Sequence, residues 1–152
     1  MRIDIKNWIG IEKSIIKGDL DGLSKETNRP HLLIIQVGNN KESNSYITGK
    51  WKDCEDVGMD VTLFKVSPQK AFKKIQNFLS SSMHFYDGII LQEPSGLTEN
   101  EKEIFLKMIG KYKDVDGFRP DSNHLPCTPK GIMLILNKFY KNPRGVVTVV
   151  GR

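Results

Sequence analysis

Three short apolar runs constrain the fold of this chain more than any other feature. They read HLLIIQVG at 31–38, YDGIILQEP at 86–94 and GVVTVVG at 145–151. A strand that is apolar at consecutive positions suits a parallel sheet covered on both faces. Segments of helical periodicity separate the runs, so we predict an α/β protein, a three-layer sandwich with a mostly parallel sheet.

The expected elements alternate along the chain. Strands are expected at 31–38, 60–67, 86–94 and 145–151, and helices at 7–25, 43–58, 68–80, 100–110 and 128–140. The first helix is expected to turn its apolar side inward, with Trp8, Ile11, Ile15, Ile16 and Leu23 on that side. Ligands of such sheets bind at the carboxyl ends of the strands, where GNNKES, QEPSG and the final GR lie.

Composition and charge argue against several functional classes. The net charge is +5, but the lysines are scattered and form no basic block, so nucleic acid is not an expected partner. No run of about 18 apolar residues is present, so no membrane span is expected. The two cysteines make no disulfide framework, which fits a reducing cytoplasm. His31 and His84 stand apart from any acidic cluster, so no metal site is expected.

One lysine lies on the apolar side of a predicted helix, in the segment SNSYITGKWKDCEDVG. At about 100° per residue, Lys50 falls between Tyr46 and Cys54, whereas Lys52 falls on the far side. Burying a charged ammonium costs several kcal/mol. The side chain can extend to water, pair with a carboxylate, or line a pocket where desolvation makes it a proton donor or acceptor.

Neighbouring side chains favour the pocket. Tyr46 lies one helical turn before Lys50, and Ser43 one turn before Tyr46, so a flat polar ligand could stack on the ring beside the amine. Gln92 ends a predicted strand and could reach the same place, or it could cap a loop. In KDVDGF, two carboxylates point the same way if the backbone is extended, but Asp-Gly is also a frequent turn pair. Cys127 is expected to be structural.

Four motifs occur together in a specific order: SNSYITGKWKDCEDVG, YDGIILQEP, KDVDGF and PCTPKGI. In order and approximate spacing they resemble the bifunctional methylenetetrahydrofolate dehydrogenase/methenyltetrahydrofolate cyclohydrolases. The resemblance implies NADP-dependent oxidation of 5,10-methylenetetrahydrofolate to 5,10-methenyltetrahydrofolate, then hydrolysis to 10-formyltetrahydrofolate, within one-carbon metabolism and purine biosynthesis. It also implies a homodimer.

The resemblance assigns roles to single residues. Lys50, Gln92 and Asp116 would be catalytic: Lys50 assists hydration of the methenyl carbon, Gln92 favours its neutral form, and Asp116 binds the amino edge of the pterin. Tyr46 would stack on the folate, and Ser43 would support the lysine. The other substrate-binding positions implied are Ile47, Thr48, Gly49, Leu91 and Glu93.

The same resemblance divides the chain. Residues 1–141 would form the catalytic domain and 142–152 the start of an NAD(P)-binding domain of Rossmann type, truncated after its first strand. Gly151 and Arg152 would open the loop that holds NADP, so the chain alone is expected to retain at most the cyclohydrolase step.

One departure from the family bears on that step. The family has an apolar residue after the glutamine, where this chain has Glu93, which could pair with Lys50 and keep it protonated. The alternative to an enzyme is therefore a degenerate, non-catalytic folate-binding or dimer-pairing module.

Overall fold

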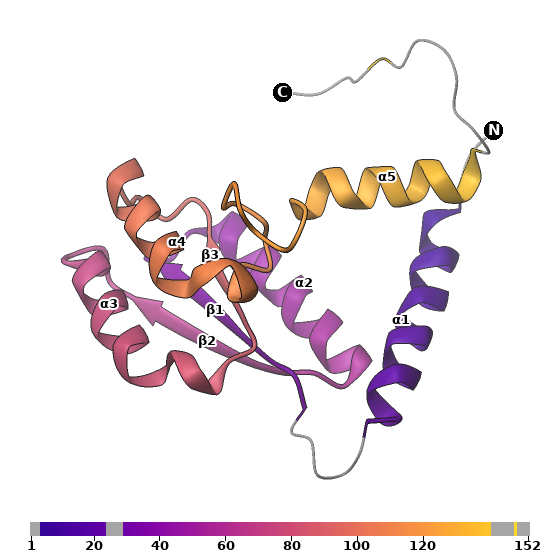
Figure 1. Ribbon diagram of the computed structural model, residues 1–152, viewed down its shortest axis with the longest axis horizontal. Coiled ribbons are helices and arrows are strands. Elements are labelled where there is room, and N and C mark those ends of the chain that lie inside the picture. The colour runs from indigo at the N-terminus through magenta and orange to yellow at the C-terminus, as the bar shows by residue number, and fades with distance from the viewer. Residues whose placement is uncertain (1–3, 24–28, 141–147, 149–152) are drawn as a thin grey trace.

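A three-stranded parallel sheet forms the centre of the structure. The structure, a computed structural model, describes residues 4–23, 29–140 and 148. Within this part, β1 (His31–Val37), β2 (Asp60–Val66) and β3 (Gly88–Gln92) pair in the order β2-β1-β3. The helices are α1 (Ile5–Asp21), α2 (Lys41–Val57), α3 (Ala71–Ser82), α4 (Glu99–Lys113) and α5 (Cys127–Phe139), with one 3-10 turn, η1 (Met83–Phe85), before β3 (Figure 1).

The middle strand, β1, is buried on both faces. The exposed fractions of Leu33, Ile34 and Ile35 are all 0%. Ile34 lies in register with Leu63 of β2 and with Ile90 of β3. A strand paired on both edges and covered on both faces needs apolar side chains at every position, which is why its sequence shows no alternation.

Helices cover the two faces of the sheet and complete three layers (Figure 1). On one face, Leu33 and Ile35 pack with Ile75 of α3 and Phe105 of α4. On the other face, residues of β1 and β3 pack with α2, in a cluster of Leu32, Ile34, Ile47, Cys54 and Ile90. The predicted α/β sandwich is confirmed, and its three described strands are all parallel.

The prediction that α1 buries its apolar side is wrong. Ile11, Ile15 and Ile16 are 52%, 53% and 44% exposed, and Leu23, which follows the helix, is 47% exposed. The helix is joined to α2 through Lys13, whose Nζ lies 2.5 Å from Asp53 Oδ1 and 2.7 Å from Asp56 Oδ2. Helical periodicity therefore identified an apolar stripe that the described residues only partly cover.

Several element boundaries differ from the prediction by a few residues, as helix ends commonly do. The largest extension is in α4, which reaches Lys113 instead of 110 because a kink at Gly110, with φ 70° and ψ 172°, joins two helical segments. The strand predicted at 145–151, like Gly151 and Arg152, lies outside the described residues. No helix in the described part of the chain is both long and apolar enough to span a membrane.

Candidate active site

The carboxyl edge of the sheet brings Lys50 and Gln92 together. Asn40 caps the N-terminus of α2 with its side-chain oxygen, which accepts a hydrogen bond from the Ser43 N–H, and Gly58 caps the C-terminus in a left-handed conformation. Two turns into this helix the half-buried Lys50 donates from Nζ to Gln92 Oε1 at 2.9 Å. Gln92 is the last residue of β3 and is only 8% exposed. The lysine on the apolar stripe thus contacts a neutral amide at the strand end.

Ser43 and Tyr46 flank this contact on the same helix. Ser43 is 1% exposed, and its hydroxyl donates to the backbone carbonyl of Glu93 at 3.2 Å. The same carbonyl accepts from Gln92 Nε2 at 2.8 Å, so Ser43 supports the lysine indirectly, through the strand end that holds Gln92. Tyr46 is 67% exposed, which leaves its ring open to a stacking ligand.

Asp116 is a half-buried carboxylate whose charge interacts with that of Lys50, so it is the candidate for binding the substrate. Burial raises the pKa of the Asp116 carboxyl, while the charge of Lys50 opposes that shift. Cys127 Sγ lies 3.7 Å from Asp116 Oδ1 and donates to it. Desolvation of the sulfur and the charge of Asp116 raise the pKa of the Cys127 thiol. Its thiol form is therefore favoured, which suits a hydrogen-bond donor and not a nucleophile.

Asp114 does not lie beside Asp116 as a second carboxylate for the substrate. It is 1% exposed, and its carboxylate accepts from the N–H groups of Gly117, Phe118 and Arg119 at 3.1, 3.3 and 2.9 Å. The backbone turns here, with φ of 70° at Gly117, so the extended alternative is wrong and the turn is correct. Asp114 holds the turn, and Asp116 lies in the loop that the turn creates.

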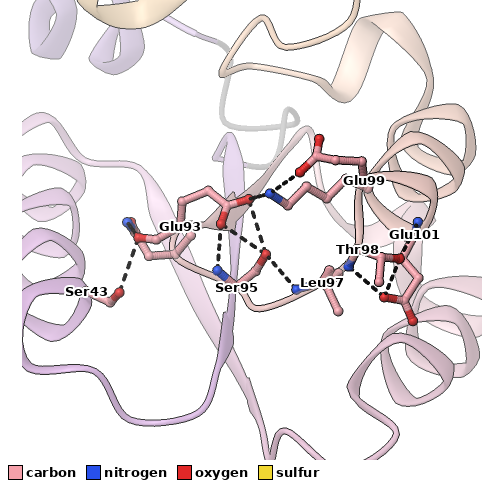
Figure 2. Close-up of polar contacts among 9 residues, drawn as sticks. Ser43, Glu93, Ser95, Leu97, Thr98, Glu99 and Glu101 are labelled. Carbon is pink, nitrogen blue, oxygen red and sulfur yellow. Dashed lines mark hydrogen bonds and ion pairs between the residues drawn. The ribbon is translucent and has the colours of Figure 1, made fainter.

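Glu93 directs its side chain away from Lys50. Its Oε2 accepts from the Ser95 N–H at 2.6 Å, and its Oε1 lies 3.2 Å from Lys102 Nζ of α4 (Figure 2). Glu93 therefore does not form the pair with Lys50 that the sequence left open, because a second lysine and a backbone donor hold its carboxylate. Sequence spacing could not identify Ser95 and Lys102 as partners of Glu93, since these contacts depend on how α4 packs beside the strand.

The remaining predicted substrate positions lie in two different environments. Ile47 and Leu91 are 5% and 7% exposed, and their side chains belong to the core clusters on opposite faces of the sheet. Leu91 also lines a pocket beside the site, whereas Ile47 does not, so the substrate-binding roles of both residues stay predictions. Thr48 donates to the Asn44 carbonyl at 2.9 Å, and Gly49 is exposed.

A pocket of about 560 Å³ adjoins the site. β3, α4 and the loop after α4 enclose it, and Glu93 and Asp116 lie on its lining, whereas Lys50 does not. Among the described residues, no three His, Cys, Asp or Glu side chains are grouped so as to hold a metal ion.

Comparison with known proteins places this geometry in a family. Residues 5–116 match the tetrahydrofolate dehydrogenase/cyclohydrolase catalytic domain. The chain belongs to this family. The resemblance carried by the four motifs is therefore confirmed, and the Lys50–Gln92 contact lies within the matched segment.

Individual relatives of this tetrahydrofolate dehydrogenase/cyclohydrolase domain agree with that assignment. The bifunctional protein FolD of Oleidesulfovibrio alaskensis is 32% identical over 162 aligned residues, covering 97% of this chain and 56% of that protein. The bifunctional FolD methylenetetrahydrofolate dehydrogenase/cyclohydrolase of Campylobacter jejuni superimposes with a TM-score of 0.74 at 28% identity, over 84% of this chain and 49% of that chain.

A Trypanosoma brucei FolD, solved with NADP cofactor and an inhibitor, has a TM-score of 0.77 at 21% identity, over 91% of this chain and 51% of that chain. At that identity it supports the fold alone. The chain spans about half the length of the curated relatives it matches.

Proposed function

We propose that this domain binds a tetrahydrofolate one-carbon substrate and hydrolyses 5,10-methenyltetrahydrofolate to 10-formyltetrahydrofolate. The observation that carries the proposal is the 2.9 Å hydrogen bond from Lys50 Nζ to Gln92 Oε1 at the carboxyl edge of the sheet. A neutral amide partner satisfies the lysine without fixing a positive charge on it. A cationic methenyl carbon is disfavoured beside an ammonium, so the reaction needs neutral Lys50 at some stage.

Each residue then has one task. Water adds to the methenyl carbon and releases a proton, which Lys50 Nζ accepts. The new hydroxyl then loses its proton as the bond from that carbon to N5 breaks and N5 gains a proton, which leaves the formyl group on N10. Tyr46 stacks on the folate, and Asp116 accepts hydrogen bonds from the amino edge of the pterin. The half-buried position of Asp116 suits this role, since a desolvated carboxylate gains more from two N–H donors than an exposed one does.

The dehydrogenase step belongs to this proposal only for a protein that also holds NADP. NADP would accept a hydride from the methylene carbon. In the described residues, none of the turns from a strand to the following helix has more than one glycine, so none fits a glycine-rich phosphate loop. The predicted cofactor residues, Gly151 and Arg152, lie outside the described part of the chain.

The test is the loss of methenyltetrahydrofolate absorbance with the purified chain, its Lys50→Ala variant and a Lys52→Ala control. Lys52 is exposed on the same helix, two residues away and on the other side, so its loss should leave the rate unchanged. Removing a general acid–base group costs roughly 10²- to 10⁴-fold, so Lys50→Ala should bring the rate close to background. A wild-type rate equal to the uncatalysed rate would contradict cyclohydrolase activity in this chain.

The alternative is a non-catalytic folate-binding or dimer-pairing module. The exposed apolar side chains of α1, such as Ile11 and Ile15, favour a role in pairing. A binding module with Lys50→Gln should keep its affinity for the folate, whereas the enzyme should lose turnover. The homodimer and the cytoplasmic location remain predictions from the resemblance and from the two cysteines, and sedimentation of the purified chain tests the first.

A further inference from the structure

Glu93 connects helix α4 to the lysine site through two sets of contacts (Figure 2). Its carboxylate accepts from the Ser95 N–H at 2.6 Å, accepts from the Ser95 hydroxyl at 3.1 and 3.2 Å, and pairs with Lys102 Nζ at 3.2 Å. Its backbone carbonyl accepts from the Ser43 hydroxyl and from Gln92 Nε2. The side chain of Glu93 therefore contacts the residues after the strand and helix α4, and its backbone carbonyl contacts Ser43 and Gln92 of the site.

The Glu93 carbonyl decides which end of the Gln92 amide faces the lysine. With Nε2 donating to that carbonyl at 2.8 Å, Oε1 is directed to Lys50 Nζ. The reversed amide would place a donor against an ammonium and an oxygen against a carbonyl oxygen, so both contacts would become repulsive. The amide orientation therefore depends on where the Glu93 carbonyl is held.

The position of that carbonyl depends in turn on an ion pair from another element. Residues 93–98 form no helix or strand, so few backbone hydrogen bonds restrain them. Lys102 approaches from α4, where it also lies 3.0 Å from Glu99 Oε1, and both carboxylates raise its pKa, Glu99 more than Glu93. The start of α4 is fixed by a capping box between Thr98 and Glu101. The ammonium group of Lys102 thus extends from the capped N-terminal end of α4.

We propose that Glu93, clamped by Ser95 and Lys102, is a positioning residue that orients the Gln92 amide oxygen toward Lys50. The catalytic consequence rests on the proposed cyclohydrolase function, whereas the amide orientation does not. The glutamate in place of an apolar residue is then a functional feature of this chain and not a sign of degeneration.

The experiment compares Lys102→Met with Lys107→Met in the full chain. Lys107 lies on the same helix and pairs with Glu103 at 2.7 Å, but both side chains of that pair are more than 60% exposed and neither contacts Glu93. Loss of a partly exposed ion pair, worth up to about 1 kcal/mol, corresponds to a change of up to about fivefold in an opening equilibrium. Hydrogen exchange of the Gln92 side-chain NH₂, followed by ¹⁵N NMR, should therefore quicken about fivefold in Lys102→Met and not in Lys107→Met.

The second readout is the split between kcat and KM for methenyltetrahydrofolate hydrolysis. In Lys102→Met, kcat should fall about fivefold with KM nearly unchanged, because the lysine partner is misaligned while the binding groups remain. Lys102→Arg, which keeps the cation, should restore both readouts. Equal Gln92 exchange rates in Lys102→Met and the control would overturn the proposal. A wild-type chain without hydrolysis would refute the proposed function. The exchange measurement would still show whether the contacts of Glu93 orient the Gln92 amide.

Discussion

Replacing Gln92 by glutamate tests whether Lys50 has to be neutral. The amide makes two contacts, accepting from Lys50 Nζ at 2.9 Å and donating to the Glu93 carbonyl at 2.8 Å. Gln92→Glu has nearly the same shape. It places a negative charge beside the ammonium and an oxygen against the carbonyl, so it changes the charge at the lysine with little change in volume.

The separation of the two groups sets the expected magnitude. Coulomb's law gives roughly 6 kcal/mol for unit charges at the 2.9 Å distance of this contact, with an effective dielectric constant of about 20. Solvent at the half-buried lysine and desolvation of the new carboxylate both reduce that value. A residual of about 3 kcal/mol corresponds to roughly a hundredfold. We therefore expect kcat for methenyltetrahydrofolate hydrolysis to fall by about a hundredfold.

The control for this prediction removes both hydrogen bonds of the amide without adding charge. Gln92→Met has a similar length, and the loss of the neutral acceptor of Lys50 should lower kcat only about fivefold. Urea unfolding of both variants checks that they fold. If Gln92→Glu keeps kcat within about threefold of the wild type while Lys50→Ala abolishes it, the neutral-amine argument is wrong.

Three further predictions concern stability, each measured by urea unfolding. Burial raises the pKa of Asp116 in the folded state. Its ionised form therefore lowers the stability of the fold at pH values above the folded and unfolded pKa, and has no such effect at low pH, where the carboxyl is protonated in both states. Asp116→Asn should thus stabilise the chain near neutral pH and lose that gain on acidification. Gly117→Ala should destabilise strongly, since φ is +70° and a Cβ would lie 2.6 Å from the His124 carbonyl oxygen. Ile75→Ala, at a fully buried position, should cost about 2–5 kcal/mol, and an effect near zero would contradict its place in the core.

The sheet and its lysine could be predicted from sequence because both depend on periodicity. The apolar run of β1 required two covered faces, and the 3.6-residue period of α2 placed Lys50 on the same side as Cys54, which the structure buries at 7% exposure. Gln92 reached the same edge because parallel strands share their carboxyl ends. These relations follow from backbone geometry, which a single sequence encodes locally.

Other features required information that periodicity does not contain. The stripe of Ile11 and Ile15 indicated an apolar side of α1, but not whether a neighbour covers it. The direction of the Glu93 side chain depends on Lys102, nine residues later in the sequence, and on the angle at which α4 leaves the turn. Such contacts are tertiary, and two acceptable partners for one carboxylate cannot be separated from sequence spacing.

The disposition of the acidic groups near Lys50 explains how a lysine there can act without an ion pair. Asp114 is held by three backbone N–H groups, Glu93 by Ser95 and Lys102, and Asp116 accepts from the Cys127 thiol. In the part of the chain that the structure describes, no carboxylate lies within ion-pair distance of Lys50. An amine whose partner is an amide can give up its proton at a lower cost than one in an ion pair. The contacts of Glu93 with Ser95 and Lys102 therefore have two effects on the lysine. They orient the Gln92 amide oxygen toward the amine, and they hold the carboxylate of Glu93 itself away from it.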